Sequence, residues 1–286
     1  MFENIGEMVL LFWRTLLALP LAWRQRQKVF DQFFEIGNAS LLMVCVLSFF
    51  IGAVLALQTG PLLVEHSMAS VVGGVVGVAV AKEMAPVMMA ILIAGRIGSA
   101  MAAEIGSMRV YQEIDALRTM NINPVHYLVL PRVVAIVIAL PMLVVFAILV
   151  GWFGGAVVAE ANNHIAIPFQ AFFSDLRDIV KPRDVANGVF KSFCFAFIIG
   201  VVSCHQGLVT IGGPRGIGRS VTKAVVNSIV LIVICHHRAT EPAGEDGENH
   251  EHRQRHGNRE DARQHEVMHR VDVHRPQRVN FLINTH

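Results

Sequence analysis

Long apolar runs, separated by short polar segments, make up most of the chain as far as Cys235. Four of these runs reach the length of about 20 residues that an α-helix needs to cross a bilayer. They occupy residues 38–64, 68–103, 126–159 and 186–211. A fifth run begins at Ala224 and ends near Cys235. The pattern predicts an all-α integral membrane protein with five transmembrane helices.

The N-terminal segment, residues 1–37, has a different pattern. Its apolar stretch, Met8–Trp23, contains Arg14 and Pro20 and is followed by the basic sequence RQRQK. A short, interrupted apolar stretch beside basic residues favours an amphipathic helix that lies in the membrane interface. We therefore predict an N-terminal interfacial helix, and a first true span is the alternative.

The polar segment 104–120 has a helical pattern of its own. Its apolar residues recur at helical spacing among charges of both signs, and Asn121, Asn123 and Pro124 end the pattern. The pattern predicts an amphipathic helix that could dock a cytoplasmic partner. The alternative is a solvated connector helix held by Arg109 with Glu113 and Asp115 with Arg118. The candidate contact residues are Glu104, Met108, Arg109, Glu113, Ile114, Asp115 and Leu117.

The distribution of Lys and Arg predicts how the helices are oriented. The N-terminal segment and the connections 104–124 and 212–223 each carry basic residues, whereas the connection 160–184 is slightly acidic and the turn 65–67 has no Lys or Arg. Short loops rich in Lys and Arg stay in the cytoplasm. We expect a multi-pass protein with a cytoplasmic N-terminus.

Three ionisable residues interrupt the second apolar run: Lys82, Glu83 and Arg96. Such groups are costly in a membrane unless they face protein or water. Lys82 and Glu83 are either a neutralising pair near the outer boundary or a polar point in the path or gate of a lipid. Arg96 is expected to bind helix ends or lipid headgroups. Small residues at four-residue spacing predict close helix packing in the same run, at Gly95, Ser99 and Ala103.

The sequence AGRIGSAMAAEIGSMRVYQEIDALRTMNINP, at Ala94–Pro124, resembles the signature of MlaE-type ABC transporter permeases. The similarity extends from about Phe30 to about Val233. It implies a homodimer in the bacterial inner membrane that moves phospholipid together with an MCE-domain protein and a cytoplasmic ATPase dimer. It also implies that the 104–120 helix engages the ATPase. Lys82 and Glu83 would occupy the family's basic-acidic pair.

No Walker A motif occurs in the chain, so ATP and magnesium are expected on the partner ATPase. We expect no enzyme activity, cofactor, metal site or nucleic-acid partner for the chain itself. One alternative is an ion-coupled secondary transporter that uses Glu83, although the 82–104 pattern is not repeated. A less favoured alternative is a zinc metalloprotease, because His265-Glu266-Val267-Met268-His269 matches H-E-x-x-H.

The composition changes near Cys235, and residues 236–286 hold nine of the 13 histidines. About a dozen apolar residues are too few to cross roughly 30 Å of hydrocarbon. We hypothesise that a frameshift replaces the native sequence from about Cys235 onward, which resequencing of the gene would test. The rival interpretation is a genuine disordered, metal-buffering tail.

Overall fold

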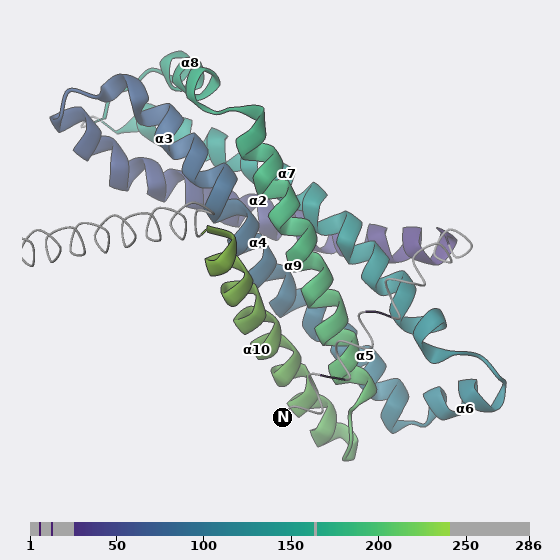
Figure 1. The fold of residues 1–286 in the computed structure, drawn as a ribbon. Coiled ribbons are helices and arrows are strands. Elements are labelled where there is room, and N and C mark those ends of the chain that lie inside the picture. The colour runs from purple at the N-terminus through teal and green to yellow at the C-terminus, as the bar shows by residue number, and fades with distance from the viewer. Residues whose placement is uncertain (1–5, 7–12, 14–25, 163–164, 241–286) are drawn as a thin grey trace, which may run out of the picture. The chain divides into compact units, whose positions relative to one another are not determined.

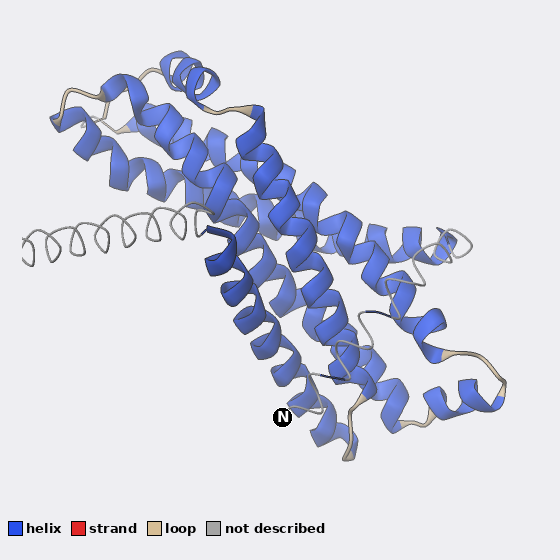
Figure 2. Cartoon of the chain, in the orientation of Figure 1, coloured by secondary structure: helices blue, strands red, loops and turns tan. Residues whose placement is uncertain are grey.

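A computed structural model describes residues 6, 13, 26–162 and 165–240 of the chain. In this part of the chain all regular structure is helical (Figure 2). The α-helices are α2 (Arg26–Glu65), α3 (Val72–Ala79), α4 (Ala85–Ile93), α5 (Ser99–Val110), α6 (Glu113–Thr119), α7 (Leu130–Ala161), α8 (Phe169–Ile179), α9 (Pro182–Leu208) and α10 (Gly213–Thr240). A 3₁₀ turn, Ala69–Val71, precedes α3, and three π-helical turns are η3 (Val80–Met84), η4 (Ala94–Gly98) and η5 (Val125–Val129).

Five helical segments in the described residues are long and apolar enough to span a membrane, which confirms the predicted all-α membrane fold. They are Arg26–Glu65, Ala69–Val110, Val125–Ala161, Pro182–Leu208 and Gly213–Arg238. The first begins at Arg26, so residues 26–37 continue into the first span as one helix. The predicted interfacial helix at Met8–Trp23 lies outside the described residues, apart from Trp13.

The fifth helix corrects the sequence prediction. The segment 212–223 was expected to be a basic loop, but α10 already begins at Gly213. The turn is tight because Gly212 and Gly213 adopt positive φ angles of +98° and +69°, which glycine tolerates. Pro214 lies in the first helical turn, where a backbone N–H has no acceptor within the helix, so the N–H that proline lacks is not missed. The helix is therefore long enough to span, and the argument that it is too short was wrong.

Residues 241–286 lie outside the described part of the chain. They contain the H-E-x-x-H match and most of the tail for which the frameshift and metal-buffering hypotheses were advanced. These hypotheses therefore stay predictions.

Helices α2 and α7 pack backbone to backbone through glycines. A Cβ atom on Gly52 would lie 1.8 Å from the carbonyl oxygen of Gly151, and one on Gly154 would lie 2.3 Å from that of Phe49. The hydroxyl of Ser48 also donates to the carbonyl of Ala147 across this contact. Small residues let two membrane helices approach this closely, and α7 thereby becomes the central partner of α2.

Helix α8 was missed by the sequence prediction, which treated 160–184 as a polar connection. Its residues Phe172 and Leu176 are buried against α3. The approach is close because a Cβ on Gly73 would lie 2.3 Å from the carbonyl oxygen of Phe172. Partial burial raises the pKa of Asp175, and the nearby charge of Asp178 raises it further. The helix closes one end of the bundle (Figure 1), which we call the α8 end.

The contact between α2 and α7 gives the first testable prediction. Gly52→Ala places a methyl group against the backbone of α7 and should lower the free energy of unfolding by about 1–3 kcal/mol. Thermal unfolding of the purified protein in detergent measures this. The matched control is Gly37→Ala in the same helix, where the added Cβ meets nothing within 4 Å. Equal melting temperatures for the two variants would contradict the packing.

Candidate functional site

The second span is one continuous helix, Ala69–Val110, interrupted by two π turns. The first, η3, contains Lys82 and Glu83, and the second, η4, contains Arg96. π turns within α-helices occur frequently at functional sites. The three ionisable residues singled out in the sequence therefore coincide with the two irregular turns of this span.

Pro86 provides the local reason for the opening at η3. Proline has no backbone N–H, so the carbonyl four residues earlier, that of Lys82, loses its usual helical donor. The ammonium of Lys191 on α9 lies 3.4 Å from this carbonyl oxygen and donates to it. The freed backbone oxygen is thus satisfied by a side chain from another span.

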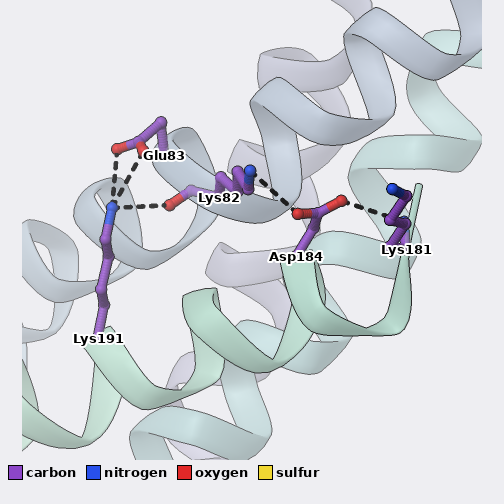
Figure 3. A network of polar contacts seen from close by, with 5 residues as sticks. All are labelled: Lys82, Glu83, Lys181, Asp184 and Lys191. Carbon is purple, nitrogen blue, oxygen red and sulfur yellow. Dashed lines mark hydrogen bonds and ion pairs between the residues drawn. The ribbon is translucent and has the colours of Figure 1, made fainter. Parts of the chain in front are cut away.

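Lys191 also binds the carboxylate of Glu83, with its Nζ 3.0 Å and 3.1 Å from the two oxygens (Figure 3). The Nε2 of His236, on α10, lies 3.4 Å from the same carboxylate. Only 14% of the Lys191 side chain and 35% of the Glu83 side chain are exposed. Glu83 therefore links three spans through polar side chains that are largely shielded.

Lys82 does not pair with Glu83, which corrects the predicted neutralising pair. Its Nζ lies 3.0 Å from the Oδ1 of Asp184. The other carboxylate oxygen of Asp184, Oδ2, accepts a hydrogen bond from the backbone N–H of Lys181 at 3.1 Å. Figure 3 shows the two neighbouring side chains reaching different partners on α9. Adjacent residues on a helix do not face each other, so each needs its own partner. We call Lys82, Glu83, Asp184 and Lys191 the polar network.

Sequence reasoning missed the role of Lys191, although the signal was present. Lys191 is an ionisable residue inside the apolar run 186–211, and the argument applied to Lys82 and Glu83 applies to it as well. What the sequence could not supply was the pairing, because Glu83 and Lys191 are 108 residues apart.

Arg96 and the neighbouring Gly95 lie on a face of the second span that no other helix covers in the described part of the chain. Arg96 is exposed, and its Nη1 lies 3.6 Å from the Sδ of Met43 on α2. A Cβ added to Gly95 would meet nothing within 4 Å. Within the described chain, no neighbouring helix therefore packs against Gly95, the first residue of the predicted small-residue set Gly95, Ser99 and Ala103. The adjacent face packs on α9 instead, where a Cβ on Gly98 would lie 2.8 Å from the Oγ of Ser203.

The segment 104–120 is not one helix as predicted. Helix α5 ends at Val110, and the chain bends at Tyr111 and Gln112 before α6 begins at Glu113. Gln112 adopts the left-handed region with φ +60°, which cannot continue an α-helix. Figure 1 shows α5 and α6 as a bent pair at the end of the bundle opposite α8. We call residues 104–120 the hook and this end the hook end.

Ion pairs fasten the hook internally and to α7. Arg109 pairs with Asp115 at 2.7 Å, not with Glu113 as predicted, whereas the predicted pair of Asp115 and Arg118 is confirmed at 3.6 Å. Glu104 pairs with Arg132 at 2.9 Å. Since Arg132 stands in the first turns of α7, the hook is tied to two spans.

The apolar residues predicted as contacts turn inward. Ile114 is fully buried in the core, and Met108 and Leu117 are partly buried against it. Ile114 is therefore unavailable to a partner in this conformation, because it seats α6 on the bundle. The large apolar side chains that the hook region exposes are others: Tyr111, Met120 and Ile122.

Comparison with known proteins gives a consistent result. A family model described as "Permease MlaE" matches residues 29–240. The chain is 38% identical over 213 residues to a probable ABC transporter permease protein of Rickettsia felis, covering 74% of this chain and 82% of that one. A protein of Synechocystis with the same description is 37% identical over 209 residues, covering 73% and 79%. The chloroplastic protein TRIGALACTOSYLDIACYLGLYCEROL 1 of Arabidopsis thaliana is 34% identical over 229 residues, covering 80% and 63%.

The polar network yields a second prediction. Lys191→Met leaves the shielded carboxylate of Glu83 without its ammonium partner and should lower the free energy of unfolding by about 1–3 kcal/mol. Adding Glu83→Gln in the same protein removes the unpaired charge and should recover part of the loss. Thermal unfolding in detergent measures all three proteins.

Arg118→Met is the matched control, because 62% of the Arg118 side chain is exposed and its loss should cost no more than about 0.5 kcal/mol. If Lys191→Met and Arg118→Met unfold at the same temperature, the network does not stabilise the contact between these spans.

Proposed function

The chain belongs to the MlaE permease family of ABC transporter permeases, and we propose that it forms the phospholipid-conducting membrane subunit of such a transporter. A separate ATPase dimer would hydrolyse ATP, and an MCE-domain protein would exchange the lipid. The observation that carries the proposal is the hook. It connects the exposed apolar residues at the hook end, such as Tyr111, with the span that contains the polar network.

The charge distribution supports a cytoplasmic position for the hook end. Exposed Arg and Lys residues gather there on several elements, alongside acidic residues such as Asp31 and Glu113, whereas the α8 end has fewer exposed Arg and Lys residues. The basic residues are Arg26, Lys28, Arg118, Arg215, Arg219 and Lys223. By the positive-inside rule, this end faces the compartment that contains ATP. The membrane would be the inner membrane of a bacterium.

A lipid cargo is supported by the chemistry of the second span and by the name of one relative. The name of the Arabidopsis protein refers to trigalactosyldiacylglycerol, which is a lipid. An amphiphile needs a path with polar groups along an apolar wall. Lys82 and Glu83 supply the polar groups about a third of the way along the second span, roughly 20 Å from Ala69 at 1.5 Å per residue.

A second copy of this chain would complete the lipid path. Arg96 is exposed on an apolar span, where an isolated charge is costly in lipid. The neighbouring residues Gly95, Ser99 and Ala103 leave space for close approach of another helix. We propose that this open face meets the partner permease and that the lipid lies between the two copies.

Coupling would proceed from the hook to the network through contiguous helix. Closure of the ATPase dimer would push on α6, and the pair of Arg109 and Asp115 together with buried Ile114 would pass this displacement to α5. From α5 the same helix continues through η4 and α4 to Lys82 and Glu83. A change in the two π turns would then open or close the lipid path. This is alternating exposure without covalent chemistry.

The contact of His236 with Glu83 favours one second candidate, an ion-coupled secondary transporter that uses Glu83. Lipid transfer between vesicles separates the two functions. Transfer that requires the ATPase and ATP supports the ABC permease, whereas transfer driven by an ion gradient without ATP supports the alternative.

The docking surface gives a third prediction. Tyr111→Asp should reduce co-purification of the ATPase at least about tenfold, because an exposed aromatic residue at a contact surface is a frequent hot spot. The residue is 69% exposed, so the fold should be kept, which gel filtration checks. ATP-dependent lipid transfer should fall in parallel.

Ile211→Asp is the matched control for this experiment. It also adds a charge to an exposed apolar residue at the hook end, but in the connection between α9 and α10. Equal loss of the ATPase from both variants would mean that the hook has no special role. If Tyr111→Asp retained the ATPase as the wild type does, Tyr111 of the hook would not be part of the interface with the ATPase.

A further inference from the structure

A second candidate site lies at the hook end, where the start of α2 meets η5 and the start of α7. The pocket is lined by Lys28, Asp31, Gln32, Tyr127, Leu128, Pro131 and Arg132. Its volume is about 220 Å³. Pockets for drug-sized molecules usually measure about 300–1,000 Å³, so this one suits a small polar group. None of its residues belongs to the polar network.

Two exposed charges of opposite sign stand at the rim of the pocket. The Nζ of Lys28 lies 3.4 Å from the centre of the Tyr127 ring, a cation–π contact. Within the described residues no ion pair is formed by Lys28 or by Asp31. The rim therefore offers one cation and one carboxylate to a ligand.

A buried donor lies at the Arg132 side of the pocket. The Nη2 of Arg132 binds Glu104 at 2.9 Å, and Nη1 donates to the carbonyl of Leu128 at 3.2 Å. The Nε of Arg132 is buried without a hydrogen-bond partner in the described residues, although such a donor is costly to leave unsatisfied. A ligand oxygen would satisfy it after a shift of the Arg132 side chain that exposes Nε to the pocket.

We propose that this pocket binds the phosphoethanolamine headgroup of a zwitterionic phospholipid. Lys28 and Arg132 take the phosphate, and Asp31 takes the primary ammonium. A lipid with only an anionic headgroup would leave Asp31 facing negative charge. A trimethylammonium group has no N–H to donate to the carboxylate. The two charges at the rim, one positive and one negative, therefore favour a headgroup that carries both a phosphate and a primary ammonium.

The surroundings of the pocket fit a lipid bound at the membrane surface. Tyr127 is partly exposed, and tyrosine is enriched where a span enters the headgroup layer. Phe30 and Phe34 are exposed on the same turns of α2 and offer an apolar surface for acyl chains. The bound lipid would hold the first turns of α2 against α7. This role is separate from transport and does not depend on the proposed cargo.

The test counts lipids bound to the full chain purified in detergent. The protein is titrated with dioleoylphosphatidylethanolamine or dioleoylphosphatidylglycerol, and bound lipid is measured by native mass spectrometry. The wild type should bind dioleoylphosphatidylethanolamine about tenfold more tightly than dioleoylphosphatidylglycerol. Asp31→Asn should abolish this preference, and Lys28→Gln should weaken the binding of both lipids about tenfold. Both residues are exposed, so the fold should be kept.

The matched controls are Asp178→Asn on α8 and Lys223→Gln on α10, which remove the same charges from exposed positions. They should bind both lipids as the wild type does. Competition with free phosphoethanolamine and with inorganic phosphate separates the headgroup from a simple anion. An unchanged preference in Asp31→Asn, or equal competition by inorganic phosphate and phosphoethanolamine, would overturn the proposal.

Discussion

The arrangement of the spans depends on the contacts that the ammonium of Lys191 makes with the second span. This ammonium stands inside an apolar helix and must be paired, and it finds both the carboxylate of Glu83 and the carbonyl that Pro86 leaves without a helical donor. Two different acceptors on one turn fix the rotation and the height of α9 against the second span. Because His236 on α10 reaches the same carboxylate, a third helix is aligned by the same point.

The second span combines rigid and adjustable parts. Glycines at other contacts, such as Gly52 against α7, bring backbones so close that neither helix can shift without repacking. At η3 the contact is as close, because a Cβ on Gly188 of α9 would lie 2.2 Å from the carbonyl oxygen of Ala81, but a π turn can convert to regular helix with a change of register. Placing ionisable residues on these turns links a change in helix geometry to a change in the position of charge. That combination suits a gate better than a static support.

Packing, rather than surface charge, holds the hook in place, as the proposed coupling requires. Exposed ion pairs such as Asp115 with Arg118 contribute only about 0–1 kcal/mol each. Complete burial of Ile114 seats α6 in the core, and the pair of Glu104 and Arg132 connects the hook with the start of α7. The predicted apolar contact residues thus serve as the inner anchor, and Tyr111 is left as the outward-facing side chain.

The sequence by itself determined the class of fold, the number of spans and several ionisable residues that had to be paired or shielded within the spans. Apolar length is a local property, and a charge such as Glu83 in an apolar run is costly in any arrangement. Only the tertiary structure decided the partners: Asp184 for Lys82, Lys191 for Glu83 and α9 for Gly98. It also decided that the hook bends at Gln112 and that α10 starts at Gly213. Pairing and packing depend on residues far apart in the chain, which a local pattern cannot specify.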